Sequence, residues 1–165
     1  YDLAGREWYQ RTLQATSPWW SEPYFNETAG GRYMTTLNLP LRDRASRRIG
    51  MVSLDVPVQA LSSSLEPLRT VAGQRTALFA PAGTIAVHPE QGIAFAHDLP
   101  GYIASAGRSD LAPMEDARAQ HRALQFTHAD PRTGAVRYSV LQPVGESGAQ
   151  SLPLVVVAGH HEDGH

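Results

Sequence analysis

The sequence contains neither cysteine nor lysine, and it has no long apolar run. The lack of cysteine excludes disulfides and thiolate sites, and it is compatible with either side of a membrane. All 14 basic residues are arginine, and with 16 acidic residues they give a net charge of -2, so we expect no nucleic-acid partner. The longest apolar run, Leu152 to Ala158, is far shorter than the roughly 20 residues of a membrane-spanning helix.

The 165 residues, 42% of them hydrophobic, can form one sizeable core or two small ones. Near the start, residues 6–15 carry apolar side chains at helical spacing and predict a short helix. Residues 32–41 and 49–56 alternate between apolar and polar side chains, which predicts an antiparallel hairpin with a polar tip. In the second of these strands, Ser53 and Asp55 share the face that points away from the expected aliphatic core.

The rest of the chain predicts one more helix of the first half and a second group of strands. Residues 58–68 have helical spacing, whereas residues 89–112 show no regular pattern. A Pro-Ala-Gly turn separates two short strands, and a helix and three further strands follow. The expected elements are strands 76–80 and 84–87, helix 113–124, and strands 124–128, 135–144 and 152–158. This order predicts an α+β fold of antiparallel sheets with flanking helices.

Polar and aromatic residues near the start have the chemistry to hold a small zwitterion or carboxylate. Arg6 can donate two N–H groups to a carboxylate, and the Trp8 indole adds a donor and a flat apolar wall. Tyr24, Asn26 and Asp55 offer acceptors for an amine. None of these residues has the setting of an activated nucleophile, so the set predicts binding and no catalysis.

Each of these residues also has an ordinary structural interpretation. Arg6 taken alone would be a solvated residue and Trp8 a packing residue, and only their joint spacing favours a site. Of Trp19 and Trp20, we expect one to form a wall of the pocket and one to pack in the core. Asp55 at the end of its strand could cap the helix that begins at Val58, alone or together with ligand binding.

Several motifs stand out along the chain: Trp8-Tyr, Trp20-Ser-Glu-Pro-Tyr-Phe, Tyr33-Met-Thr-Thr, Ile49-Gly-Met-Val-Ser-Leu-Asp and Leu78-Phe-Ala-Pro-Ala-Gly-Thr-Ile-Ala-Val-His-Pro. Together they resemble the double Cache (PDC, PAS-like) extracytoplasmic sensor domains of bacterial signalling proteins. The resemblance implies two tandem PAS-like modules, a distal one in residues 1–70 that lacks its amino-terminal part and a proximal one in residues 71–165. It also implies a periplasmic location, in a protein anchored in the inner membrane by helices outside this chain.

The same resemblance implies a signalling role without a cofactor. The output would be a histidine kinase, a PP2C-type phosphatase, a chemoreceptor or a diguanylate cyclase, and a homodimer is one arrangement left open. The amino-acid-binding branch of the family uses a tyrosine, Arg-x-Trp, a second tyrosine and two aspartates, which Tyr1, Arg6, Trp8, Tyr24 and Asp55 match in order. Asn26 stands where the first aspartate is expected, which weakens the attraction for a free ammonium group. The expected ligand-binding residues are Tyr1, Arg6, Trp8, Trp20, Tyr24, Asn26, Ser53 and Asp55.

Two alternatives to a ligand sensor stay open at this point. The chain could be a ligand-free module for dimerisation or docking. It could also be a small metal-dependent hydrolase that uses His88, His97 and Asp98, although no further ligand stands at a useful spacing. The carboxyl-terminal Gly-His-His-Glu-Asp-Gly-His could chelate a transition metal, or it could be a solvated terminus.

Overall fold

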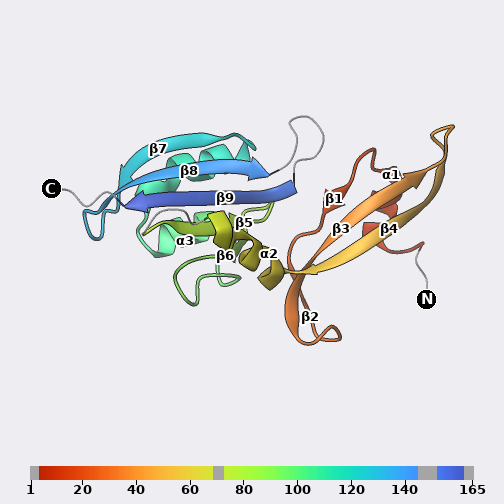
Figure 1. The fold of residues 1–165 in the computed structure, drawn as a ribbon, viewed down its shortest axis with the longest axis horizontal. Helices are drawn as coiled ribbons and strands as arrows, with labels where there is room; N and C mark the ends of the chain where they lie inside the picture. The colour runs from red at the N-terminus through yellow and green to blue at the C-terminus, as the bar shows by residue number, and fades with distance from the viewer. Residues whose placement is uncertain (1–3, 69–72, 145–151, 162–165) are drawn as a thin grey trace.

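A computed structural model describes residues 4–68, 73–144 and 152–161 of the chain. Its strands form two antiparallel sheets, which lie one after the other along the long axis of the molecule (Figure 1). Helix α2 (Val58–Leu65) and the short 3-10 helix η1 (Glu66–Leu68) follow the first sheet in the chain. In the described residues, no helix is both long and apolar enough to cross a membrane.

The first sheet consists of β1 (Trp19–Trp20), β2 (Tyr24–Asn26), β3 (Arg32–Arg42) and β4 (Arg48–Pro57). The long strand β3 pairs with the other three, and all pairs are antiparallel, as the alternating pattern predicted. Helix α1 (Glu7–Gln14) is anchored by Thr12, which is buried and whose hydroxyl accepts a hydrogen bond from the indole N–H of Trp19 at 3.1 Å.

The apolar face of the β3–β4 hairpin differs from the sequence-based expectation. We expected it to lie on an aliphatic core, yet Val52 and Leu54 are 49% and 56% exposed, and Leu41 is exposed as well. In register, Leu54 pairs with Leu37 and Val52 with Leu39, so these side chains share one face of the hairpin. The prediction of a buried face was therefore wrong for the described residues, because periodicity identifies the two faces of a strand but not what covers them.

The second sheet has the strand order β6-β5-β9-β8-β7 and is antiparallel throughout. Its strands are β5 (Arg75–Phe79), β6 (Ile85–Val87), β7 (Leu124–Ala129), β8 (Val136–Val144) and β9 (Leu152–His161). The Pro-Ala-Gly turn joins β5 to β6 as predicted, and Gly83 takes a φ of 97° there, which favours glycine. The largest cluster of buried apolar residues lies between this sheet and its helices and includes Ile85, Leu99 and Leu141.

Three helical segments cover one face of the second sheet: α3 (Leu99–Ser105), η2 (Ser109–Leu111) and α4 (Ala112–Ala119). The first two lie within residues 89–112, so the expectation of an irregular segment was wrong. Asp98 caps α3 by accepting a hydrogen bond from the Gly101 N–H at 2.8 Å, a signal that the sequence carries. Helix α4 is shorter than predicted and ends before His121, which has a φ of 50°.

Two contacts tie the first sheet to the second half of the chain. The ring of Tyr33 in β3 stacks on the ring of Phe95, with 3.7 Å between centroids and 2° between planes. The Glu22 carboxylate accepts a hydrogen bond from the Ala82 N–H in the β5–β6 turn at 2.8 Å. The division into two modules near residue 70 stays a prediction, and the two sheets lie on either side of that point.

Candidate functional site

A cavity of about 470 Å³ lies on the polar face of the first sheet. Four of the residues that line it are predicted ligand-binding residues, and three were not predicted. The described lining consists of Trp8, Ser21, Tyr24, Thr36, Asn38, Ser53 and Asp55. Local periodicity and strand pairing thus gather side chains from α1, β2, β3 and β4 around one space.

Strand register explains how this polar face is assembled. Asp55 in β4 lies directly opposite Thr36 in β3, and Ser53 lies opposite Asn38. Residues that are directly opposite in an antiparallel pair project on the same side of the sheet. These two cross-strand pairs therefore form a polar patch on one face of the hairpin, and Trp8 of α1 lines the same cavity.

Asp55 is held at the edge of the cavity by two hydroxyl groups. Its Oδ1 accepts a hydrogen bond from Thr36 Oγ1 at 2.7 Å and one from the Tyr24 hydroxyl at 3.3 Å. Asp55 does not cap helix α2, because Pro57 occupies the N-cap position and no side chain caps this helix. The capping alternative was therefore wrong, and Asp55 Oδ2 accepts no hydrogen bond from the described residues.

The floor of the cavity is uncharged. Asn38 is fully buried, and its side-chain oxygen accepts a hydrogen bond from the Ser53 hydroxyl at 2.8 Å. The Ser21 hydroxyl oxygen accepts a hydrogen bond from the Thr36 N–H at 2.9 Å, which leaves the Ser21 proton free to donate. Of the described lining residues, Asp55 supplies the one carboxylate and none is an arginine.

The other predicted residues lie outside this lining. Arg6 is exposed and precedes α1 at its N-cap position. Trp20 pairs with Leu37, which places it on the opposite face of the sheet from the Asn38 row. The side-chain oxygen of Asn26 accepts hydrogen bonds from the backbone N–H groups of Thr28 and Ala29, at 3.1 and 3.0 Å, and so stabilises the β2–β3 turn. Tyr1 lies outside the described residues, and ligand contacts of these four residues stay predictions.

Sequence reasoning missed Ser21, Thr36 and Asn38 as lining residues. The signal for two of them was present, because Thr36 and Asn38 alternate with Leu37 and Leu39 along one strand. Their position beside Ser53 and Asp55 depends on the register of the β3–β4 hairpin. A long polar loop between two strands does not fix that register, so the sequence alone did not predict it.

The histidine residues do not assemble a metal site in the described part of the chain. No three His, Asp or Glu side chains there are placed to share a metal ion. Asp98 caps α3, and the His88 ring nitrogen Nδ1 accepts a hydrogen bond from the Glu90 N–H at 3.0 Å. His160 and His161 of the histidine-rich end belong to β9, and residues 162–165 lie outside the described part.

With this geometry established, the chain was compared with known proteins. Residues 1–63 match the family model described as methyl-accepting chemotaxis protein-like, first PDC sensor domain. No curated protein matches the chain. Among solved structures, the extracellular domain of mmHK1S-Z2, assigned as a histidine kinase, has a TM-score of 0.71 and 18% identity over 96% of this chain.

Two chemoreceptor domains of Pseudomonas aeruginosa PAO1 have the same fold. The ligand-binding domain of PctC, solved with GABA, has a TM-score of 0.62 and 20% identity over 97% of this chain. That of PctB, solved with L-Arg, has a TM-score of 0.60 and 22% identity over 99% of this chain. The chain spans 56% of the mmHK1S-Z2 structure, 63% of PctC and 62% of PctB, so it corresponds to part of each.

The sequence match and the structural likeness agree with each other. The family match covers the segment that forms α1 and the first sheet, where the candidate site lies. The structural likeness extends over nearly the whole chain, including the second sheet. Residues 1–63 are therefore similar in sequence to the methyl-accepting chemotaxis protein-like first PDC sensor domain, and the chain has the fold of the extracellular sensor domains of histidine kinases and chemoreceptors.

Proposed function

We propose that this chain is the ligand-binding extracytoplasmic part of a bacterial membrane signalling protein, and that the cavity of the first sheet binds an amino acid or a small carboxylate. The observation that carries the proposal is the cavity itself, about 470 Å³ in volume, with one carboxylate among hydroxyl, amide and aromatic groups. This volume is within the usual range for small-molecule sites, which are concave and place a few polar groups among apolar ones.

The lining chemistry supports a ligand with an amine. A ligand ammonium group beside Asp55 would pair with the Asp55 carboxylate, and the hydrogen bonds from Thr36 and Tyr24 hold that carboxylate in position. The indole of Trp8, 38% exposed, offers an aromatic face to the same cation. PctC and PctB, whose structures contain GABA and L-Arg, support this class of ligand.

The acid end of the ligand would meet neutral donors. Ser21 can donate its hydroxyl proton, and the indole N–H of Trp8 adds a second donor. Arg6, two residues before Trp8, stays our candidate for a charged contact with the ligand carboxylate. Because the described lining holds one carboxylate, an amine gains less attraction than it would between two, which extends the expected ligands to simple carboxylates and weak bases.

In this proposal strand β3 transmits the signal, because its residues both line the cavity and contact the second half of the chain. Thr36 and Asn38 line the cavity, and Tyr33 on the same strand stacks on Phe95. A ligand that binds one arrangement of this strand more tightly than another shifts the population between them. We propose that this shift reaches a histidine kinase, phosphatase or chemoreceptor output through membrane helices outside this chain.

The test is a titration of the chain with standard amino acids, GABA and short carboxylates, followed by thermal shift and calorimetry. A ligand that binds only the folded state stabilises it by about 2.7 kcal/mol at a hundredfold excess over Kd. Asp55→Asn should weaken binding of the amine-bearing ligand at least tenfold and leave its hydroxy-acid analogue nearly unaffected. The matched control is Asp116→Asn, an exposed aspartate on α4.

Equal loss of the amine and its hydroxy-acid analogue in Asp55→Asn would contradict an amine at this position. Absence of binding by every compound up to about 10 mM would contradict the sensor proposal for this cavity. In that case the second candidate, docking of another copy of the chain, gains weight from the exposed apolar residues Leu41, Val52 and Leu54. Sedimentation of wild type against Leu54→Ser would then decide between monomer and dimer.

A further inference from the structure

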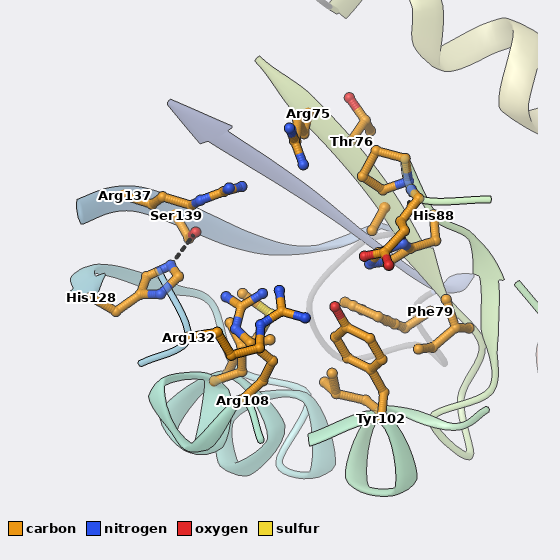
Figure 2. Close-up of a pocket in the computed structure, with 17 residues that line it drawn as sticks. Arg75, Thr76, Phe79, His88, Tyr102, Arg108, His128, Arg132, Arg137 and Ser139 are labelled. Carbon is orange, nitrogen blue, oxygen red and sulfur yellow. Dashed lines mark hydrogen bonds between the residues drawn. The ribbon is translucent and has the colours of Figure 1, made fainter. Parts of the chain in front are cut away.

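A second cavity lies between the second sheet and helices α3, η2 and α4, well separated from the first in the chain. Its volume is about 100 Å³, so it has room for a molecule only a few times the size of water. One side is apolar and includes Phe79, Ile85 and Leu99. The other side carries arginines, and Figure 2 shows both sides around one space.

Four arginines from four different segments meet at this cavity. Arg75 comes from β5, Arg108 precedes η2, Arg132 lies in the β7–β8 turn and Arg137 is in β8. In Figure 2 their guanidinium groups point toward the same region. Such groups repel one another unless carboxylates or a bound anion lie between them.

Two aspartates pair directly with two of these four arginines, and Glu90 adds a carboxylate to the lining of the cavity. Asp110 accepts two hydrogen bonds from Arg108, at 2.9 and 2.8 Å. Asp130 accepts from the Arg132 guanidinium, at 3.2 and 3.0 Å, and lies 3.6 Å from Arg108. These aspartates therefore serve Arg108 and Arg132.

Arg75 and Arg137 form no ion pair with a carboxylate of the described residues. The Nε atom of Arg137 is buried and has no hydrogen-bond partner there. Burial lowers the pKa of the Arg137 guanidinium and the positive charges of Arg75 and Arg108 lower it further, against the opposing effect of the Asp130 and Asp110 carboxylates. A buried donor without a partner carries a free-energy cost, which a bound acceptor would remove.

The strand register places Arg75 and Ser139 on the same face of the second sheet. Arg75 pairs with Gly159 in the central strand β9, and Gly159 pairs in turn with Ser139 in β8. Arg137 lies two residues before Ser139 and projects on the same face of β8, and all three side chains line the cavity. Arg75 and Arg137, which form no ion pair with a described carboxylate, thus lie with Ser139 along one part of the cavity wall.

Ser139 adds a hydroxyl group to that end. Its Oγ lies 2.8 Å from Nε2 of His128, whose Nδ1 lies 2.7 Å from Asp110. This arrangement resembles a nucleophilic triad, but Ser139 lies in β8, which pairs with β7 on one side and with β9 on the other. The backbone N–H groups of this strand are engaged in the sheet and are not free to stabilise an oxyanion. The geometry therefore fits binding better than catalysis.

We propose that this second cavity binds a carboxylate of two or three carbon atoms, with the carboxylate between Arg75 and Arg137 and the short apolar end toward Phe79 and Ile85. Arginine pairs carboxylates through parallel N–H groups, which matches the charged side. The apolar side favours a carboxylate over inorganic phosphate, since phosphate has no apolar end. The proposal does not depend on the function of the first cavity.

The experiment is isothermal titration of the full chain with acetate, propionate and inorganic phosphate in a chloride buffer. We expect wild type to bind propionate, and Arg137→Gln to weaken this binding at least tenfold. The control is Arg122→Gln, an exposed arginine after α4, which should bind propionate like wild type. Because Arg137 faces like charges, Arg137→Gln without ligand should melt no lower than wild type.

Three results would overturn the proposal: equal binding by Arg137→Gln and wild type, binding of phosphate without propionate, or no propionate binding up to about 10 mM. If Arg137→Gln does not fold, NMR of the wild-type arginine Nε–H groups gives the answer. Propionate should then shift the Arg137 and Arg75 signals and leave that of Arg122 unchanged. Unshifted Arg137 and Arg75 signals would also overturn it.

Discussion

Replacing Asp130 by asparagine should destabilise the chain in a pH-dependent manner. The Asp130 carboxylate is almost fully buried, and it accepts hydrogen bonds from the Arg132 guanidinium and from the Arg132 N–H, the latter at 2.9 Å. These contacts, with the nearby charge of Arg108, lower the pKa of Asp130 from its ordinary value of 3.8 to about 2, against the opposing effect of burial. A shift of this size corresponds to about 2 kcal/mol of folding free energy.

The sign follows from the lowered pKa. The ionised form is favoured in the folded state, so the stabilisation is complete above about pH 5 and is lost as the pH falls toward 2, with about half left at pH 3. Asp130→Asn removes this charge at every pH. Its free energy of unfolding should therefore be about 2 kcal/mol below that of wild type at pH 7 and about 1 kcal/mol below it at pH 3.

Urea denaturation at a series of pH values between 7 and 3 measures this difference directly. The difference between variant and wild type isolates Asp130 from the other carboxylates, which titrate in both proteins. Asp116→Asn, at an exposed position on α4, should show no such difference. A deficit of Asp130→Asn that is the same at pH 7 and pH 3 would refute the assignment of the effect to charge.

Three further predictions concern packing and hydrogen bonding. A double-mutant cycle of Tyr33→Ala and Phe95→Ala should give a coupling energy of about 1 kcal/mol in urea denaturation, and purely additive effects would contradict a stabilising stack. Thr12→Val should cost about 1–2 kcal/mol, because the buried Trp19 indole N–H loses its acceptor, and unchanged tryptophan fluorescence and stability would contradict this contact. Ile85→Ala should cost about 2–5 kcal/mol in the same assay, since Ile85 is fully buried, and a cost below 1 kcal/mol would place it outside the core.

The first candidate site was largely accessible to sequence reasoning because its geometry is local. Alternation along residues 49–56 places Ser53 and Asp55 on one face, and this period-two relation needs no tertiary information. The Pro-Ala-Gly turn and the short helix α1 are local in the same sense. The resemblance to PDC sensor domains was carried by the same segment and was confirmed by the family match over residues 1–63.

The second cavity could not be predicted, because its charged side chains meet only after distant segments pair. Arg75 and Arg137 are separated by more than sixty residues in the sequence, and they approach because β5 and β8 both pair with β9, the last of the described strands. No periodicity in the sequence encodes which distant strands pair, since that choice depends on burial of the whole sheet against α3 and α4. The exposure of Val52 and Leu54 has the same origin: alternation assigns them to one face of a strand, and tertiary packing alone decides whether that face is covered.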